Sequence, residues 1–475
     1  MLCPPLYPRS TPVGRCLGTV LLGGLVLLGL SACDADPGPV QPDVVAAAKV
    51  QSNGMTKILV CHWSIEDQRF FQISVAGPSL PGHRRHGDGL IGEDVPGQSG
   101  MVFDDDCQPV HRVPDVIPRT LAVGYRHTCA ISASGETYCW GDNEYGQLGT
   151  GTTSGSSAPV PVVGGRSFVH IVAGRDHTCA LDRSGAAFCW GLNDGGQLGD
   201  GTTTNAPSPV AVQGEHRFVQ LAAADAASGF GGHTCGLDPD GAAFCWGTNA
   251  EGELGDGTND PSPTPVPVVG NHHFVQLTAG TSYACGLTEE GSAFCWGGNW
   301  GGGLGIGTPG DVATPTPVVG DHVFTEVAAG GSSGVHTCAL DIAEAAFCWG
   351  WGIYGQRGDG TWTHGAYSPV PVIGGHTFSR IAAGRGHTCA LDTSGAAYCW
   401  GLNWAGGLGN GNTTNTSAPV AVLGGHSFVQ IDLGLHHTCA EDGDGVLFCW
   451  GGNDFGQLGD GTTTPSLVPI QTLPF

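Results

Sequence analysis

The sequence predicts an all-β protein in which residues 113–475 form a seven-bladed β-propeller of about 50-residue, four-strand repeats, preceded by a small N-terminal module. A unit of this length recurs seven times over that range. Each unit contains four extended stretches of four to seven residues, separated by clusters of Gly, Asn, Asp, Ser and Pro. No helical period competes with these stretches. Radial closure of such units leaves only short, protected sheet edges, which favours a propeller.

The first 33 residues have the features of an export signal. Arg9 and Arg15 precede an apolar stretch over residues 17–30, which is shorter than the roughly 20 residues that span a bilayer. The stretch ends in Leu30-Ser31-Ala32-Cys33, which resembles the lipobox of bacterial lipoproteins. This resemblance implies cleavage before Cys33 and acylation of Cys33. The alternative is an ordinary signal peptide that is cut at a small residue nearby. Residues 34–55 are predicted to be a solvated tether.

The number of cysteines agrees with export. Of the 19 cysteines, Cys3 and Cys16 leave with the signal and Cys33 carries the lipid, so that 16 remain. An even number is expected of a disulfide framework outside the cytoplasm.

Residues 56–112 are predicted to be a separate small module that resembles a short module of bacterial surface proteins. It contains residue types that bind zinc, namely Cys61, His62, His83 and His86. The even cysteine count favours a Cys61–Cys107 disulfide with solvated histidines. We therefore predict no metal and no cofactor, with zinc bound by those four residues as the alternative.

The repeat carries a pair of cysteines ten residues apart in every copy. The pairs are Cys129 and Cys139, Cys179 and Cys189, Cys235 and Cys245, Cys285 and Cys295, Cys338 and Cys348, Cys389 and Cys399, and Cys439 and Cys449. A three-residue turn at residues 183–185 would place Cys179 opposite Cys189 on adjacent strands, where a disulfide would add about 2–3 kcal/mol. The alternative is a metal site that includes His177. The fourth copy argues against it, because Tyr283 replaces the histidine while both cysteines remain.

The two ends of the repeat region suggest how the ring closes. Residues 466–470 match the proline-rich last strand of the other units, but no first strand follows them. The first copy begins with a matching strand at residues 121–124. We therefore expect one blade to be completed by both termini.

The repeat motif resembles the regulator of chromosome condensation repeat family. The shared string is Gly-x-x-His-Thr-x-Ala-Leu, then Gly-x-x-Phe/Tyr-x-Trp-Gly-x-Asn-x-x-Gly-Gln-Leu-Gly-Asp-Gly, over about 360 residues. The resemblance implies a seven-bladed propeller but no single activity. The founding member is a nucleotide exchange factor on chromatin, and secreted bacterial relatives bind and inhibit β-lactamases. The export signal places this chain nearer to the secreted bacterial branch.

Two motifs within the repeat resemble functional sites but are explained as parts of the repeat itself. Gly-Gln-Leu-Gly-Asp-Gly has no lysine after its glycines and begins no helix, which excludes a P-loop. In the fifth copy this segment contains Arg357-Gly358-Asp359, the tripeptide of cell adhesion. Arg357 stands where most copies have leucine, so we interpret it as a variant of the repeat.

Two positions after each Trp-Gly-x-Asn, where Gly352 replaces the asparagine in the fifth copy, vary between copies, and five of the seven pairs carry an aromatic residue. These residues are Tyr145, Trp300, Tyr354, Trp404 and Phe455. Equivalent loops lie on one face of a propeller, and Tyr and Trp are enriched at binding hot spots. We therefore predict that they form a partner-binding face. The alternative is that they pack between blades.

The composition limits the function. The formal net charge is −25 and the chain has two lysines, Lys49 and Lys57. A nucleic-acid partner requires a basic surface, so none is expected, and contact with a membrane is expected through the lipid anchor alone. We predict a non-enzymatic, extracytoplasmic scaffold in the cell envelope, or secreted, that binds a protein or a surface polymer. The alternatives are an enzyme, for example one acting on glycans in the axial funnel, and, third, a guanine-nucleotide exchange factor.

Overall fold

The computed structural model describes residues 119–224, 232–331 and 335–475 with their side chains. Nearer the N-terminus it describes the backbone of five strands: β1 (Lys49–Ser52), β2 (Met55–Ser64), β3 (Arg69–Ala76), β4 (Met101–Phe103) and β5 (Pro109–His111). The predicted export signal, the predicted lipid acceptor Cys33, residues 34–48 of the predicted tether and the side chains of the small module lie outside the described residues, whereas β1 falls within the range predicted to be tether. The side chains of the module that lie outside include those of Cys61, His62, His83, His86 and Cys107.

The chain divides into two compact units, Met1–Val110 and His111–Phe475. In the first unit, β1, β2 and β3 form an antiparallel sheet, and β4 pairs with β5. The second unit contains the repeats.

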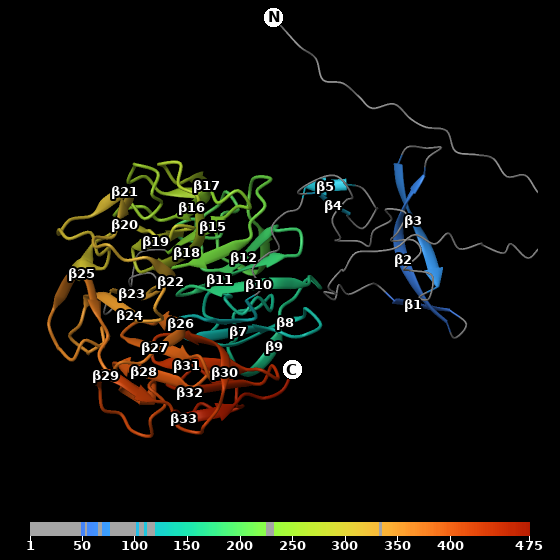
Figure 1. The fold of residues 1–475 in the computed structure, drawn as a ribbon. Coiled ribbons are helices and arrows are strands. Elements are labelled where there is room, and N and C mark those ends of the chain that lie inside the picture. Colours follow the sequence, from blue (N-terminus) through green and yellow to red (C-terminus); the bar gives the residue numbers. More distant parts are fainter. Residues whose placement is uncertain are drawn as a thin grey trace, which may run out of the picture. The chain divides into compact units, whose positions relative to one another are not determined.

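The second unit is a seven-bladed β-propeller, as the sequence predicts, and each blade is an antiparallel sheet of four strands that are consecutive in the chain (Figure 1). The first strands of the blades are β6 (Leu121–Val123), β10 (Phe168–Ala173), β14 (Gln220–Ala223), β18 (Phe274–Gly280), β22 (Phe324–Ala329), β26 (Phe378–Ala383) and β30 (Phe428–Leu433). The second strands are β7 (His127–Ile131), β11 (His177–Asp182), β15 (His233–Leu237), β19 (Tyr283–Thr288), β23 (His336–Asp341), β27 (His387–Asp392) and β31 (His437–Asp442). The third strands are β8 (Thr137–Gly141), β12 (Ala187–Gly191), β16 (Ala243–Gly247), β20 (Ala293–Gly297), β24 (Ala346–Trp351), β28 (Ala397–Gly401) and β32 (Leu447–Gly451). The fourth strands are β9 (Ser156–Pro161), β13 (Ala206–Ala211), β17 (Ser262–Pro267), β21 (Val312–Pro317), β25 (Gly365–Pro371), β29 (Thr416–Ala421) and β33 (Ser466–Gln471).

The core lies between neighbouring blades and is built around the tryptophan of each repeat. Trp190 is fully buried, and its Nε1 donates a hydrogen bond to the Gln147 carbonyl of the preceding blade at 2.9 Å. Gly149 must be a glycine here, because its φ is +67° and a Cβ would lie 2.8 Å from Trp190 Nε1. The Gly-Gln-Leu-Gly loop is therefore a clamp between blades.

Each blade carries one disulfide between its second and third strands. In the second blade Cys179 pairs directly with Cys189 in the strand register, after a turn closed by the Gly185 N–H on the Asp182 carbonyl at 3.0 Å. All seven repeat pairs are joined in this way. Their sulfur atoms are therefore not available as metal ligands.

The expectation that both termini complete one blade is wrong. Strand β6 is the first strand of the first blade, and β33 is the fourth strand of the last blade. In each blade the chain runs from the innermost strand to the outermost, so every blade is formed by one continuous segment of the sequence. The ring closes through side chains instead: Trp140 Nε1 donates to the Gln457 carbonyl at 2.9 Å, and Arg119 pairs with Asp432 at 2.7 Å.

No helix within the described ranges is both long enough and apolar enough to cross a membrane.

Candidate partner-binding face

One face of the propeller collects the loops in which the repeats differ. In an antiparallel four-strand blade, the loop between the first and second strands lies at the same end as the loop between the third and fourth. The first kind of loop includes Tyr125, Arg126, Arg175, Arg385 and His436. The second kind includes Tyr145, Trp300, Tyr354, Trp404 and Phe455. We call this end of the propeller the aromatic face. Residues 225–231 and 332–334, which follow β14 and β22 in the sequence, lie outside the described part.

The predicted aromatic residues on this face are exposed to different extents. Trp300 and Trp404 begin short 3-10 turns, η2 (Trp300–Gly302) and η3 (Trp404–Gly406), and are 57% and 63% exposed. Phe455 is 38% exposed, while Tyr145 and Tyr354 are half-buried. Large aromatic side chains this exposed leave considerable apolar area in contact with water.

In three of these loops a buried glutamine side chain fixes the backbone at the aromatic residue. The N–H groups of Tyr145, Tyr354 and Phe455 donate to the amide oxygen of the glutamine two positions later, at 2.9–3.0 Å. The loops are therefore fixed by the repeat, although their outward side chains vary.

The centre of the aromatic face is basic. The guanidinium carbons of Arg126, Arg175 and Arg385 lie 4.9, 4.5 and 4.6 Å from the centroid of the Tyr125 ring. Arg126 also lies 4.4 Å from the ring of Phe455. Cation–π contacts of this kind hold the three arginines, from three different blades, around one ring. Sequence reasoning missed this cluster, although these positions also vary between copies.

A cavity of about 340 Å³ opens beside this cluster. Tyr354 and Trp404 line it together with Arg126, Arg385 and His436. The indole of Trp404 meets the His436 ring edge to face at 4.5 Å. Burial, followed by the charges of Arg385 and Arg126, lowers the pKa of His436 to about 4, so the imidazole is neutral at pH 7. The structure thus brings two of the five predicted aromatics into one cavity.

Trp300 has different neighbours. Its Nε1 donates to both carboxylate oxygens of Glu251 at 2.8 and 2.9 Å. The next residue, Gly301, has φ +62°, and a Cβ there would collide with the indole of Trp351. Trp351 is therefore packed against the neighbouring blade, whereas Trp300 itself remains open to solvent.

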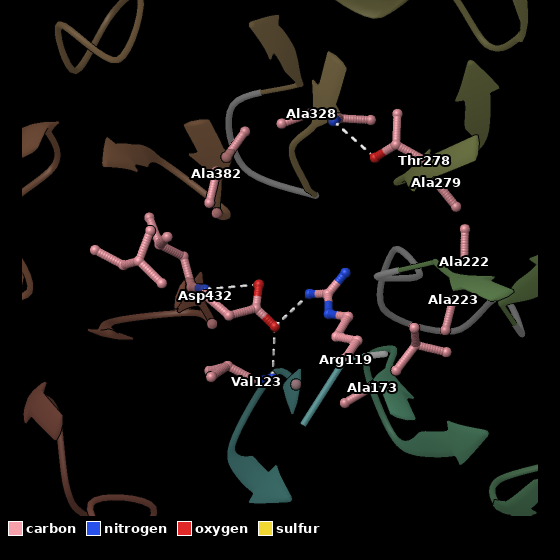
Figure 2. A pocket seen from close by; sticks show the side chains of 18 of the residues that line it. Arg119, Val123, Ala173, Ala222, Ala223, Thr278, Ala279, Ala328, Ala382 and Asp432 are labelled. Atoms are coloured by element: carbon pink, nitrogen blue, oxygen red, sulfur yellow. Dashed lines mark hydrogen bonds and ion pairs between the residues drawn. The ribbon is translucent and has the colours of Figure 1, made fainter. Parts of the chain in front are cut away.

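The axial channel is a cavity of about 510 Å³ lined by the first strands of the blades. Figure 2 shows Arg119 and Asp432 meeting inside it, where Asp432 also accepts a hydrogen bond from the Val123 N–H at 2.8 Å. This ion pair fastens the first strand of the first blade to the last blade.

Polar side chains at one level of the channel bridge neighbouring blades. Gln276 both accepts from the Val327 N–H at 3.0 Å and donates to the Val327 carbonyl at 3.2 Å. Glu326 takes the equivalent position in the next blade and accepts from the Ile381 N–H at 3.2 Å. Burial raises the pKa of Glu326 to about 7, although Arg380 opposes the shift. A protonated Glu326 has the donor and acceptor that glutamine has.

Histidine–threonine hydrogen bonds join the second strands of neighbouring blades, except between the third and fourth blades, where His233 Nε2 has no hydrogen-bond partner among the described residues. His127 Nε2 bonds to Thr178 Oγ1 of the next blade at 2.9 Å, and His437 closes the ring on Thr128 at 3.1 Å. Tyr283 takes the histidine's place in the fourth blade and bonds to Thr337 at 2.9 Å. Burial lowers the pKa of His127 to about 3, which keeps the ring neutral. The repeat histidine is thus structural.

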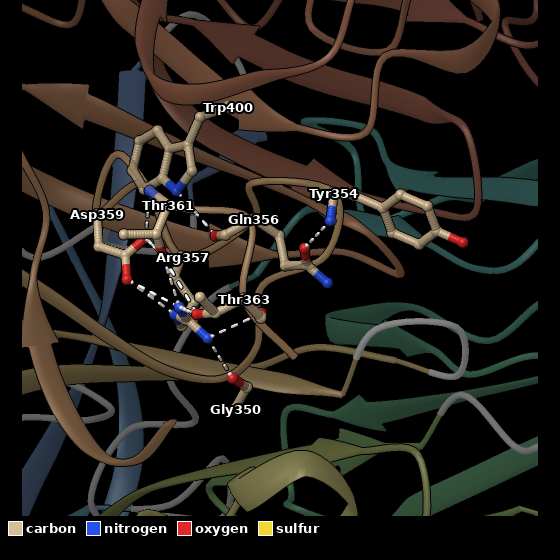
Figure 3. Close-up of polar contacts among 8 residues, drawn as sticks. All are labelled: Gly350, Tyr354, Gln356, Arg357, Asp359, Thr361, Thr363 and Trp400. Carbon is tan, nitrogen blue, oxygen red and sulfur yellow. Dashed lines mark hydrogen bonds and ion pairs between the residues drawn. The ribbon is translucent and has the colours of Figure 1, made fainter. Parts of the chain in front are cut away.

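The Arg357-Gly358-Asp359 tripeptide is part of the internal structure (Figure 3). Arg357 is 2% exposed, and its guanidinium donates to Asp359 at 2.9 Å and to the Gly350 carbonyl at 3.0 Å. A buried arginine is not available to an adhesion receptor.

The described residues contain no group of three or more His, Cys, Asp or Glu side chains that could hold a metal ion. The zinc alternative concerned side chains outside that part of the chain.

Comparison with known proteins identifies the family. The model of the RCC1-like domain matches residues 224–474, more than half of the chain. The chain belongs to the RCC1-like domain family. Models of the regulator of chromosome condensation (RCC1) repeat also match residues 134–181 and 184–230, and residues 119–147 and 168–197.

Relatives of this RCC1-like chain include larger proteins. It is 32% identical over 329 residues to the probable E3 ubiquitin-protein ligase HERC4 of Homo sapiens, covering 66% of this chain and 20% of that protein. It is 31% identical over 360 residues to the ultraviolet-B receptor UVR8 of Arabidopsis thaliana, covering 74% of this chain and 63% of that protein. The chain therefore spans about a fifth of HERC4 and less than two thirds of UVR8. Both relatives are eukaryotic, and a bacterial lipoprotein branch stays a prediction.

Solved structures share the RCC1-like fold. Prp20p of Saccharomyces cerevisiae has a TM-score of 0.64 at 24% identity, covering 72% of this chain and 87% of that one. Human WBSCR16 has a TM-score of 0.61 at 20% identity, covering 81% and 98%. At these identities the likeness shows the fold alone.

Proposed function

We propose that this chain is a non-enzymatic scaffold whose aromatic face binds another protein outside the cytoplasm. The observation that carries the proposal is the exposure of Trp300, Trp404 and Phe455 on the face where the repeats differ. Exposed aromatics beside arginines are the composition of protein-binding hot spots. The yeast relative Prp20p, which has the same fold, has binding properties toward Gsp1p and histones.

The proposed location depends on the cysteines. The seven disulfides of the propeller suggest an oxidising environment, because the cytosol keeps such thiols reduced. We place the propeller in the cell envelope, tethered through a lipid on Cys33. A surface polymer is the alternative partner.

The carboxylates in the axial channel favour binding over catalysis, because each of them already has a hydrogen-bond or ion-pair partner in the protein. Asp432 is paired with Arg119, and Glu441 accepts a hydrogen bond from Thr120 at 2.6 Å. Glu326 accepts from the Ile381 backbone. Each of these carboxylates already joins one blade to another, which accounts for its presence without a catalytic role.

A cross-linking pull-down from envelope extract tests the proposal. The bait is the full chain, compared with a Trp300→Ala/Trp404→Ala/Phe455→Ala variant. The control is an Ile342→Ala/Ile373→Ala variant, which removes exposed apolar side chains from loops at the opposite end of the blades. We expect a protein captured by the wild type and the control to be lost from the aromatic variant. Equal capture by all three chains would refute the proposed face, and loss of a glycan in place of a protein would favour the polymer.

A further inference from the structure

The basic cluster on the aromatic face is unusual for this chain. The whole sequence has 17 lysines and arginines against 42 acidic residues. Three of those arginines, Arg126, Arg175 and Arg385, converge within 5 Å of the Tyr125 ring. Like charges gathered in this way repel one another, so the arrangement costs free energy unless an anion offsets it.

The protein supplies part of that compensation. Arg175 pairs with Asp176 at 3.0 Å. Arg126 and Arg385 have no carboxylate partner among the described residues. In addition, Nε and Nη1 of Arg385 are buried and have no hydrogen-bond partner. Buried donors of a charged group are expensive to leave unsatisfied, and both arginines line the 340 Å³ cavity.

We propose that this cavity binds a carboxylate of an acidic segment of the partner protein, bridged by Arg126 and Arg385, with a neighbouring apolar side chain against Tyr354, Leu402 and Trp404. The inference rests on the proposed function and names the chemistry of the partner. Guanidinium groups hold carboxylates through charge-assisted hydrogen bonds, and Arg126 and Arg385 both line the cavity without a carboxylate partner among the described residues.

The distribution of charge selects a peptide over a polyanion. The net charge of the chain is −25, so a long polyanion would be repelled by the surface around the cluster. One or two carboxylates on an otherwise apolar segment would contact Arg126 and Arg385 and present little other negative charge to this acidic chain. His436 lines the cavity as a neutral ring, with its pKa lowered to about 4 by burial and by the two arginines, so it adds an uncharged wall at pH 7.

The direct test is peptide binding by fluorescence anisotropy. The probe is a rhodamine-labelled, acetylated hexapeptide of alternating Glu and Leu, and its twin has Gln in place of Glu. The variants are Arg126→Gln/Arg385→Gln and a matched control, Arg183→Gln/Arg217→Gln, which removes the same charge from exposed loops at the opposite end of the blades. An Arg385→Lys variant keeps the charge but loses the guanidinium geometry.

We expect the Glu–Leu probe to bind the wild type and the control, and the Gln–Leu twin to bind at least about tenfold more weakly. The Arg126→Gln/Arg385→Gln variant should lose about tenfold or more in affinity with its circular dichroism and disulfides intact. Arg385→Lys should lie between them. Unchanged binding to the double variant, equal binding of the two peptides, or no binding to the wild type would overturn the inference.

Two competitors separate the sources of the anion. Inorganic phosphate and oligogalacturonate are each added to the bound probe. Displacement by either at concentrations below those of the acidic peptide itself would overturn the choice of a peptide carboxylate. The pull-down is repeated with the double arginine variant: if it still captures the partner, this inference fails while the proposed aromatic face stands.

Discussion

The fifth blade contains a pair of replacements that a double-mutant cycle can test. In the second blade the amide of Asn193 donates to Thr202 Oγ1 at 3.2 Å and to the Thr204 carbonyl at 3.1 Å. The fifth blade has Gly352 at the asparagine position and Arg357 at the position of a buried leucine. The Arg357 guanidinium bonds to the equivalent atoms, Thr361 Oγ1 at 2.8 Å and the Thr363 carbonyl at 3.3 Å (Figure 3). The guanidinium of Arg357 therefore makes the hydrogen bonds that the asparagine side-chain amide makes in the other blades, and it reaches these acceptors from a different position in the loop.

The single substitutions are expected to destabilise the protein strongly. Arg357→Leu removes the donor of the buried Gly350 carbonyl and the partner of the half-buried Asp359, and breaking a buried ion pair costs about 3–5 kcal/mol. Gly352→Asn alone places a Cβ 2.6 Å from Arg357 Cζ, and overpacking costs about 1–3 kcal/mol. The double variant recreates the arrangement of the other blades and should lie within about 1 kcal/mol of the wild type. The coupling free energy is then about −3 kcal/mol or more negative.

The assay is guanidinium-induced unfolding of the four full-length chains without reductant. Hydrogen exchange of residues 350–365 provides a local measurement that does not require all seven blades to unfold together. Additive losses in the double variant, or an Arg357→Leu variant as stable as the wild type, would refute the replacement of asparagine by arginine.

Three further predictions concern the interior. Ala284→Thr should stabilise the protein by about 1 kcal/mol in thermal unfolding, because His233 Nε2 has no hydrogen-bond partner where other blades supply threonine; an unchanged or lower Tm would contradict it. Glu326→Gln should raise the free energy of unfolding by about 1–3 kcal/mol at pH 8 and change it little at pH 4. The pKa of Glu326 in the folded protein is raised to about 7, so its protonated form stabilises the protein below pH 4.5. This contribution is lost as the pH rises through 7. A variant with the wild-type pH profile would exclude this role of Glu326. Acid should destabilise the propeller progressively from pH 6.5 toward pH 4, by about 1.4 kcal/mol per pH unit for each buried histidine, because unfolding lets it take up a proton; denaturant midpoints that stay constant from pH 7 to 5 would contradict it. The histidines concerned, each with its pKa lowered by burial to about 3 or 4, are His127, His177, His233, His387 and His437.

The repeat made most of the fold predictable. Strand length, turn residues and the ten-residue cysteine spacing determine the register that pairs Cys179 with Cys189. The place where the ring closes was predicted wrongly, since a repeated sequence has no inherent beginning and the phase of its strands within a blade can be chosen in more than one way. Only the contacts of β6 and β33 fix that phase.

The candidate site was predictable in part. Exposed Trp300 and Trp404 follow from comparing the copies, because a side chain that packs between identical blades has no reason to vary. The cluster around Tyr125 was missed, since each of its arginines resembles an ordinary solvated loop residue in the sequence. These arginines meet because the ring brings the first, second and sixth blades to a common axis. The same comparison between copies, applied to the two residues before each repeat histidine, would have drawn attention to them.

Departures from the repeat differ in whether the protein compensates for them. Gly352 is compensated by Arg357, and Gly301 provides the space that the indole of Trp351 fills. Such pairs preserve the structure and require no ligand. Arg385 is different, because this residue lines a cavity on the aromatic face and no described side chain accepts from its Nε or Nη1. An arginine that lines a cavity and has no carboxylate partner within the described part of the protein is where a partner can supply one, and this is why we place the partner's carboxylate there.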